Sequence, residues 1–477
     1  MKSVTFSLLQ SAANAFDFGG PVLCDAHHYG EGHINDTFVV WREDHSKRFI
    51  LQRINTDTFT NPVGLMENVC GVTRHLRAKI LAEGGDPARE TLNVIPTLSG
   101  STCYLDADGG AWRAYDFVED TICLQQVGSE TDFRTVAETL GKFQNQLEDY
   151  PASTLHETIA RFHDTPNRYA NFEKALAADA LGRAKNITSE IEFIHARKQD
   201  CHVLLDQLAA GEIPLRVTHN DTKINNVLID AATGKGICVI DLDTVMPGLS
   251  AYDFGDSIRT GANDCAEDEP DQSKVHFDLH LYEVFAKGYL STAGASMSMA
   301  EKKSLAWGAR LMTLECGIRF LTDYLEGDHY FHIARPDHNL DRARTQFKLT
   351  ADMETNGKPR STVEEVYGQI VKDLSESSAL FEKHAKRRGS FRVNLPTVNI
   401  LLSRVYLHME VWDEAIAAAT KAIENGNLLT NYVNLPESPI CIANYNYSEV
   451  EWVYGNGNTP TRNLNAVVVS TGLREKL

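Results

Sequence analysis

The sequence has few of the features that mark secreted, membrane-spanning or nucleic-acid-binding proteins. Its nine cysteines are an odd number and include no C-x-x-C pair, which indicates a reducing compartment rather than a disulfide framework. Basic residues number 46 against 65 acidic ones, and the net charge of −19 disfavours non-specific binding to nucleic acid. Residues 1–20 carry one lysine and an interrupted apolar run, which does not fit a signal peptide, and no apolar stretch is long enough to span a bilayer. We therefore expect a cytoplasmic protein without nucleic-acid or membrane partners.

The most informative pattern is a polar loop followed by an apolar strand that ends in acidic residues. The loop reads Thr-His-Asn-Asp at 218–221, and Asn226 follows five residues after Asp221. The strand-like run Ile-Cys-Val-Ile ends at Asp241. Magnesium usually binds one or two carboxylates together with phosphates and water, and an Asn amide oxygen with an Asp carboxylate meets that need. A further carboxylate must orient the acceptor hydroxyl and take its proton in phosphoryl transfer.

These residue types and their spacing predict a kinase. Asp221 fits the catalytic base, and Asn226 and Asp241 fit the Mg²⁺ ligands, with ATP as the phosphoryl donor. The alternative is a polar loop with incidental acids, because Asp and Asn are ordinary turn formers. The strand-like runs at 213–217, 227–229 and 236–240 favour the kinase, because they place the acids at loop and strand ends.

A glycine-containing segment precedes two predicted strands near the start of the chain. Gly30 and Gly32 come before the run 38–41, and a polar turn separates that run from 49–54. Kinases lay backbone of this kind over the phosphates of ATP, although glycines in this position also form plain hairpin turns. Together with the loop downstream, the pattern predicts that Gly30 and Gly32 contact the nucleotide.

Seven segments, in order along the chain, carry a resemblance to a known family. They are Gly-Glu-Gly-His-Ile-Asn at 30–35, Ile-Leu-Gln at 50–52, Gly-Gly-Ala-Trp-Arg at 109–113, His-Asp-Thr-Pro at 163–166, Leu-Arg-Val-Thr-His-Asn-Asp-Thr-Lys at 215–223, Asp-Phe-Gly-Asp-Ser-Ile-Arg at 253–259 and Glu-Cys-Gly-Ile-Arg-Phe-Leu at 315–321. Over about residues 6–353 the chain resembles the N-acetylhexosamine 1-kinases, a branch of the aminoglycoside phosphotransferase and choline kinase superfamily.

This resemblance implies an α+β, bilobal fold of the protein-kinase type. A β-rich, nucleotide-binding N-lobe is expected at 1–125, and a mainly helical C-lobe that carries the catalytic and sugar-binding residues at 126–355. The implied reaction is ATP-dependent phosphorylation of the anomeric hydroxyl of N-acetylglucosamine (GlcNAc) or N-acetylgalactosamine (GalNAc). The family's substrate-contacting positions carry over onto residues of the required types, which are His33, Asp221, Arg319 and Tyr330.

The predicted nucleotide site departs from kinases in general at one position. The strand position that usually carries a phosphate-binding lysine holds Gln52, as it does in the kinases that the chain resembles. Magnesium, backbone amides or an inward-turned Arg53 would then have to neutralise the phosphates. The segment after the next strand is the predicted hinge, which gives Asp116, Phe117 and Val118 as adenine contacts. Core packing of the aromatic side chains is the alternative for the hinge.

The last part of the chain differs in character from the kinase-like part. It contains Arg-Ser-Thr-Val-Glu-Glu-Val-Tyr at 360–367, Arg-Val-Tyr-Leu at 404–407 and Trp-Asp-Glu-Ala-Ile-Ala at 412–417. These motifs predict amphipathic helices in a tetratricopeptide-like arrangement, and 357–477 resembles an internal fragment of SusD-like glycan-binding proteins. The lipobox and leading segment of that family are absent, so the resemblance does not extend to glycan binding.

Three functions follow from these observations. The first is a sugar 1-kinase, the second a kinase of the same fold for choline, homoserine or an aminoglycoside, and the third a non-catalytic SusD-like glycan-binding protein. The combination of Asp221, Asn226 and Asp241 favours a kinase over the third. Arg319 and Tyr330 favour a sugar over a cationic substrate, because a cation prefers acids and aromatic faces to an arginine.

Overall fold

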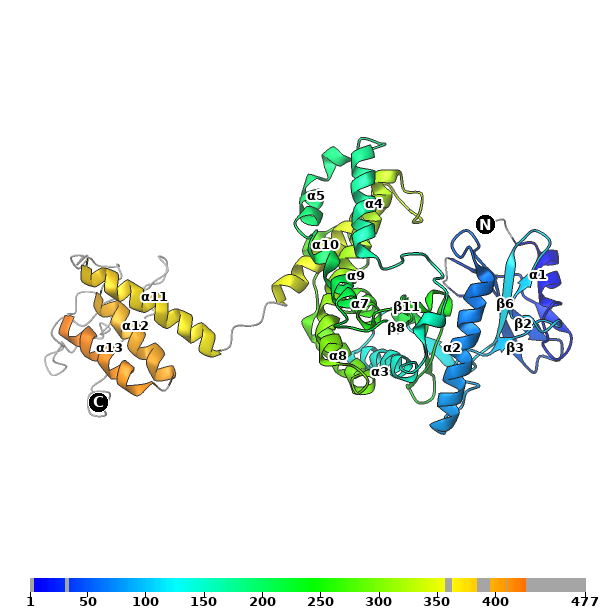
Figure 1. Cartoon of the computed structure of the whole chain (residues 1–477), viewed down its shortest axis with the longest axis horizontal. Coiled ribbons are helices and arrows are strands. Elements are labelled where there is room, and N and C mark those ends of the chain that lie inside the picture. The colour runs from blue at the N-terminus through cyan, green and yellow to red at the C-terminus, as the bar shows by residue number, and fades with distance from the viewer. Residues whose placement is uncertain (1–3, 31–33, 357–362, 384–394, 410, 426–477) are drawn as a thin grey trace, which may run out of the picture. The chain divides into compact units, whose positions relative to one another are not determined.

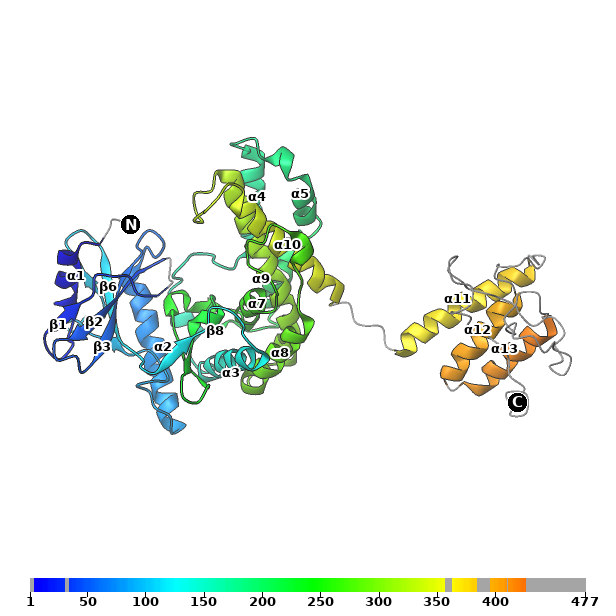
Figure 2. The same ribbon diagram turned by 180° about the vertical axis from the view of Figure 1, so that it is seen from behind.

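The computed structural model describes residues 4–30, 34–356, 363–383, 395–409 and 411–425. The chain divides into two compact units, Met1–Lys358 and Pro359–Leu477. Figures 1 and 2 show the elements of each unit from opposite sides. In the described part of the chain, no helix is both long and apolar enough to cross a membrane.

The first unit begins with an antiparallel sheet in the strand order β1–β2–β3–β6–β4, with β5 also paired to β6. The elements here are α1 (Phe6–Ala13), β1 (Val22–Cys24), β2 (Asp36–Arg42), β3 (Arg48–Ile54), α2 (Pro62–Ala82), β4 (Val94–Ile95), β5 (Tyr104–Leu105) and β6 (Ala111–Asp116). Leu51 and Trp112 pack with α1, whereas Ile54 packs in the core that contains α2. Because side chains alternate along a strand, Gln52 and its registered partner Arg113 lie on the α2 side.

A mainly helical part follows, as the sequence predicts for a C-lobe. Its elements are β7 (Thr121–Cys123), α3 (Glu130–Gln146), α4 (Thr165–Ala178), α5 (Thr188–His195), α6 (Val203–Ala209), β8 (Arg216–Thr218), β9 (Val227–Asp230), β10 (Gly236–Val239), β11 (Met246–Gly248), α7 (Ser250–Gly261), α8 (Leu279–Ala293), α9 (Met299–Glu326) and α10 (His338–Asn356). Short 3₁₀ turns at Ile224–Asn226 and Leu242–Thr244 precede β9 and follow β10. The predicted strands at 227–229 and 236–240 coincide with β9 and β10.

Helices α7 and α9 cross so closely that glycine is required at the contact. A Cβ atom on Gly308 of α9 would lie 2.0 Å from the carbonyl oxygen of Ala251 in α7, and one on Gly255 would lie 2.2 Å from the carbonyl oxygen of Gly308. Such distances are sterically impossible, so neither glycine can be replaced without moving the helices apart. This contact matters for function because α7 and α9 both carry side chains that hold the loop containing Asp221.

His163 links α9 to that loop. Its Nδ1 lies 2.9 Å from a carboxylate oxygen of Glu315, and its Nε2 lies 3.0 Å from the carbonyl oxygen of Asn220. Both partners accept hydrogen bonds, so both ring nitrogens must carry hydrogen and the ring is an imidazolium. Burial lowers the pKa of His163, but the charge of Glu315 and its hydrogen bond outweigh burial and raise the pKa above its usual value.

We predict that His163→Gln changes the pH dependence of stability. Because the folded pKa of His163 lies above the unfolded value of about 6.5, the charged ring contributes stability that is fully present below pH ~6.5 and is lost as pH rises through the folded pKa. The difference in free energy of unfolding between wild type and His163→Gln should therefore be largest near pH 6 and shrink toward pH 9. Urea denaturation at several pH values measures this difference.

The matched control for this prediction is His280→Gln. His280 pairs with Glu130 at the surface, where both side chains are more than half exposed, and such a pair contributes little to stability. No comparable trend with pH is expected for this variant. A difference between wild type and His163→Gln that stays constant from pH 6 to pH 9 would contradict a charged ring at position 163.

The second unit contains three described helices. They are α11 (Val363–Lys383), α12 (Leu395–His408) and α13 (Trp412–Asn425). Val398 and Leu402 of α12 and Ala418 of α13 form a small apolar core. Ser378 of α11 and Asn399 of α12 add a buried hydrogen bond of 3.4 Å. The unit thus has a core of its own, separate from those of the first unit.

Candidate active site

Helix α7 fixes the loop that contains Asp221. The carboxylate of Asp253, in the first turn of α7, accepts hydrogen bonds from the main-chain nitrogens of His219 (2.9 Å) and Asn220 (2.7 Å). Asn220 has a left-handed backbone conformation, φ 65°, which asparagine adopts more readily than most residues. Its side-chain amide donates to the carbonyl oxygen of Thr244 at 2.9 Å. These bonds hold the loop in one shape and present Asp221 in a defined position.

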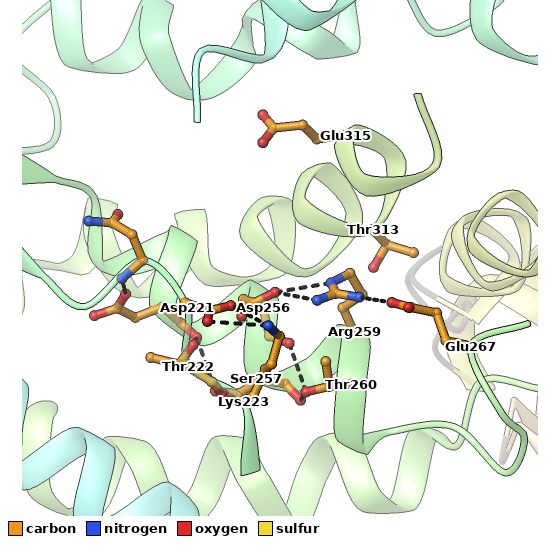
Figure 3. Close-up of polar contacts among 12 residues, drawn as sticks. Asp221, Thr222, Lys223, Asp256, Ser257, Arg259, Thr260, Glu267, Thr313 and Glu315 are labelled. Carbon is orange, nitrogen blue, oxygen red and sulfur yellow. Dashed lines mark hydrogen bonds and ion pairs between the residues drawn. The ribbon is translucent and has the colours of Figure 1, made fainter. Parts of the chain in front are cut away.

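Asp221 keeps its negative charge through contact with Lys223. The ammonium nitrogen of Lys223 lies 2.9 Å from a carboxylate oxygen of Asp221, and Figure 3 shows the two side chains turned toward each other. Burial raises the pKa of Asp221, but the charge of Lys223 and their hydrogen bond outweigh it and hold the pKa below its usual value. The Asp221 side chain remains 23% exposed. It is therefore a charged carboxylate that a ligand can reach.

Asn226 and Asp241 come together because β9 and β10 pair as a hairpin. The main-chain nitrogen of Ile240, which directly precedes Asp241, donates to the carbonyl oxygen of Asn226 at 2.9 Å. The side-chain NH₂ of Asn226 donates to the carbonyl oxygen of Asp221 at 2.8 Å. This bond occupies the amide nitrogen of Asn226, and no described residue donates a hydrogen bond to its amide oxygen. The three predicted residues thus lie around one end of the hairpin.

Asp241, one of the two predicted metal ligands, differs from the other acids of the site in its surroundings. Its backbone is left-handed, φ 60°, an unusual conformation that occurs at functional sites. The residue is exposed, and no described residue forms a hydrogen bond or ion pair with its carboxylate. The surrounding protein, together with the negative charges of Asp243 and Asp221, raises the pKa of Asp241 to about 6. A divalent cation would remove this repulsion, and Mg²⁺ needs only one or two protein carboxylates. Among the described residues, no group of three or more His, Cys, Asp or Glu could hold a metal ion.

Asp243, two residues further on, is already occupied by protein partners. One carboxylate oxygen forms an ion pair with Arg113, and the other accepts a hydrogen bond of 2.6 Å from the side-chain amide of Asn35. The Nε of Arg113 donates to the side-chain oxygen of Gln52 at 2.9 Å, and the Gln52 amide donates to the hydroxyl of Thr37 at 2.9 Å. This chain of contacts joins the sheet of the N-lobe to the strand end that carries Asp241.

Of the three alternatives for neutralising the phosphates, an inward-turned Arg53 does not agree with the structure. Arg53 follows Gln52 in β3, so its side chain lies on the opposite face of the sheet, where its guanidinium carbon is 5.9 Å from the centre of the Trp112 ring. The cation on the inner face is Arg113. Sequence reasoning did not single out Arg113, because the pairing of β3 with β6 and its register cannot be read from two separate segments of the chain.

The start of the glycine-containing segment contacts the predicted hinge. Gly30 has a left-handed backbone, φ 79°, which glycine adopts without strain. The ring of the preceding Tyr29 meets the ring of Phe117 edge-on, with 5.7 Å between centres. The guanidinium of Arg48 covers Phe117 at 3.6 Å. Gly32 lies outside the described residues.

The main-chain groups of the hinge differ in availability. The nitrogen of Asp116 donates to the carbonyl oxygen of Asn93 at 3.0 Å. The nitrogen of Phe117 donates to the carbonyl oxygen of Arg48 at 3.4 Å. No described residue accepts from the nitrogen of Val118. Of the three predicted adenine contacts, Val118 is the one whose N–H is left for a ligand.

Arg319 and Tyr330 lie together in the C-lobe. The guanidinium of Arg319 is 6.0 Å from the centre of the Tyr330 ring and 5.5 Å from that of Phe162. The carboxylate of Asp323 accepts hydrogen bonds from three successive main-chain nitrogens, those of 329–331, and so fixes the segment that carries Tyr330. His33, the remaining predicted substrate contact, lies outside the described residues.

A second arginine accompanies Arg319. Arg168 donates to the carbonyl oxygen of Phe162 at 2.7 Å, and burial together with the charge of Arg319 lowers the pKa of Arg168. Phe162 adjoins His163, which contacts the loop that carries Asp221. Both arginines thus contact Phe162, and the next residue in sequence, His163, touches the loop of Asp221. Sequence reasoning did not single out Arg168.

Near the loop, Arg259 forms a further polar cluster with two acidic residues. Figure 3 shows its guanidinium between Asp256 and Glu267, with contacts of 2.8 Å to each. A cavity of about 240 Å³ opens beside this cluster and is lined in part by Lys223 and Gln346. Arg259 and Asp256 therefore form an ion pair inside the protein, which agrees with the commoner structural use of such residues.

Comparison with known proteins places these features in a family. The family model described as "APH: Phosphotransferase enzyme family" matches residues 25–287, more than half of the chain. Among solved structures, a microcompartment-associated aminopropanol kinase is 17% identical with a TM-score of 0.49, and 73% of this chain covers 97% of that one. An aminoglycoside phosphotransferase from Alicyclobacillus acidocaldarius is 12% identical with a TM-score of 0.48, covering 73% and 95%. The choline kinase LicA from Streptococcus pneumoniae is 13% identical with a TM-score of 0.40, covering 70% and 93%.

The structural likenesses are too distant to carry an argument about substrate, whereas the family model spans both the sheet and the loop that carries Asp221. It includes the strands that bear Gln52 and Arg113 as well as Asp221, Asn226 and Asp241. The chain belongs to the phosphotransferase enzyme family.

Proposed function

We propose that this phosphotransferase transfers the γ-phosphoryl group of ATP to the anomeric hydroxyl of an N-acetylhexosamine, GlcNAc or GalNAc, and so forms the sugar 1-phosphate. The observation that carries the proposal is the position of Asp221. It is a charged, reachable carboxylate on a fixed loop, next to the hairpin end that bears Asn226 and Asp241. The geometry of a base beside two oxygen ligands fits phosphoryl transfer to an alcohol.

Asp221 would orient the acceptor hydroxyl and take its proton. The transition state of phosphoryl transfer is loose, so positioning contributes more than proton abstraction early in the reaction. A carboxylate whose pKa is held low by Lys223 suits this role, because it stays charged and accepts a hydrogen bond from the hydroxyl throughout. Lys223 would also place a positive charge near the transferring group.

Asn226 and Asp241 would hold Mg²⁺ through one amide oxygen and one carboxylate. The exposed, unpaired carboxylate of Asp241 and its raised pKa of about 6 support this assignment over Asp243, whose oxygens are occupied. When bound, the ion neutralises charge on the β- and γ-phosphates. In this assignment, Gly30 lies near the phosphates and the N–H of Val118 contacts adenine.

Arg319 and Tyr330 support a sugar as the acceptor. A guanidinium and a phenol offer donors and acceptors to the hydroxyl and acetamido groups of a sugar, whereas choline and aminoglycosides carry positive charge. With Arg168 beside Arg319, a cationic acceptor would enter a site that already contains two positive charges. We therefore place the sugar ahead of choline, homoserine and aminoglycosides, and infer that His33 completes its contacts.

The second unit would not take part in the transfer. We propose that its three helices are the tetratricopeptide-like part of a SusD-like fragment, on the basis of its sequence motifs and its separate small core. The proposed base, metal ligands and acceptor contacts all lie within Met1–Lys358. A non-catalytic glycan-binding function would leave the charged Asp221 and the unpaired Asp241 without a purpose.

We predict that Asp221→Asn lowers kcat by about 10²–10⁴-fold, the usual contribution of a positioned general base, and leaves the affinity for MgATP within a few-fold of wild type. The amide is nearly isosteric but cannot accept the proton. Steady-state kinetics of sugar-dependent ATP turnover measure kcat, and calorimetry measures nucleotide affinity. Asp271→Asn is the control, since Asp271 is about half exposed and lies on a surface turn. An unchanged kcat in Asp221→Asn would remove Asp221 as the base.

The substrate prediction requires a panel of acceptors. With Mg²⁺ and ATP, we expect turnover with GlcNAc or GalNAc, less or none with glucose and galactose, and none with choline or homoserine. Phosphorus NMR should identify the phosphate on C1 of the sugar. Turnover of choline or homoserine with no turnover of either N-acetylhexosamine would overturn the proposed substrate. Repeating the panel on a chain that ends at Asn356, the last residue of α10, measures whether the second unit affects activity.

A further inference from the structure

The phosphate site of this protein has no cation in the place where kinases usually have one. A lysine on the third strand normally pairs with the nucleotide phosphates, and here that position is Gln52, which is neutral. The surrounding site is rich in negative charge, because Asp221, Asp241 and Asp243 lie around the same end of the β9–β10 hairpin. A nucleotide triphosphate brings further negative charge, which a protein cation near Gln52 would offset together with Mg²⁺ and Lys223.

Arg113 occupies the position from which that cation could act. It lies on β6 directly opposite Gln52 on β3, on the same face of the sheet. Its Nε donates to Gln52 at 2.9 Å and its Nη1 forms an ion pair with Asp243. Among the described residues, no acceptor contacts its Nη2, so part of the guanidinium fork is left for another partner.

The burial of Arg113 limits the screening of its charge by water, and its hydrogen bonds fix the orientation of its guanidinium. The side chain is only 1% exposed, so water screens its charge little. Gln52 and Asp243 contact two edges of the planar guanidinium, and these contacts fix its orientation before a nucleotide binds. Asp243 also accepts from Asn35, at the end of the glycine-containing segment, so the same carboxylate orients both Arg113 and the backbone that precedes β2.

We propose that Arg113 is the cation of the nucleotide phosphate site and replaces, from the neighbouring strand, the lysine that Gln52 does not provide. Asp243 is its positioning residue. The free Nη2 donor and the weakly screened charge would favour the phosphates of ATP over an uncharged nucleoside. This inference rests on the proposed use of ATP but not on the identity of the acceptor.

The test compares nucleotides that differ in phosphate. Calorimetry of wild type and Arg113→Gln should show that the variant loses about 10- to 100-fold in affinity for MgATP, the range for removal of a charged hydrogen-bonding group, and keeps its affinity for adenosine. The matched control is Arg53→Gln, which removes a buried arginine from the adjacent strand on the opposite face and should leave both affinities unchanged. Equal MgATP affinity in wild type and Arg113→Gln would overturn the inference, as would an equal loss for adenosine.

Returning the lysine to its ordinary strand gives a second variant. Because Gln52 lies opposite Arg113, the double variant Gln52→Lys with Arg113→Gln exchanges the cation between two registered positions. We expect it to recover at least part of the MgATP affinity that Arg113→Gln loses. A double variant that folds but binds MgATP no better than Arg113→Gln would show that position 113 contributes packing rather than charge.

A measurement on the wild-type chain keeps the inference testable if Arg113→Gln does not fold. The ¹⁵N NMR signal of the Arg113 Nε, assigned by its loss in Arg113→Lys, should move when a non-hydrolysable MgATP analogue binds and stay in place with adenosine. A signal unmoved at saturating analogue would overturn the inference. Wild type that binds MgATP but phosphorylates no N-acetylhexosamine would overturn the proposed acceptor alone.

Discussion

The site depends first on one carboxylate that satisfies two main-chain donors. Asp253 accepts from the nitrogens of His219 and Asn220, and without it both buried N–H groups would lose their partners, at a cost of about 1–3 kcal/mol each. Burial raises the pKa of Asp253, while the charge of His219 and these two hydrogen bonds oppose that rise. Asp253 lies in the first turn of α7, and α7 packs closely against α9 at Gly308. The position of the loop is therefore set by two packed helices.

The charges of the site are arranged so that every acid except one has a protein partner. Lys223 pairs with Asp221, Arg113 with Asp243, and main-chain donors bind Asp253. Asp241 alone among these has no such partner in the described structure, and its raised pKa records the repulsion that results. Local repulsion of this kind is a common feature of functional sites, because the missing charge arrives with the ligand. The same arrangement distinguishes Asp241 from Asp243, because both carboxylate oxygens of Asp243 are occupied by protein partners.

The features that could be predicted from the sequence rest on patterns of residues that lie close together in the chain. The spacing of Asp221, Asn226 and Asp241 lies within 21 residues, and alternating apolar runs on either side marked β9 and β10. The β-rich start and helical continuation were implied by the family resemblance, which itself rests on short segments. The parts that were missed depend on contacts between distant segments. Arg113 meets Asp243 across 130 residues, and no local signal reports which strands will be neighbours.

Strand boundaries were missed for a different reason. The run 213–217 was expected to be a strand, but β8 begins at Arg216 and continues to Thr218. Pro214 lacks the N–H that a ladder needs, so apolar character alone overestimated the strand at its start. Its end is set by pairing with β11, where Met246 is registered opposite Thr218. The strand ends at Thr218, and the main-chain nitrogen of the next residue, His219, donates to Asp253. The end of β8 therefore helps to position the loop that carries Asp221.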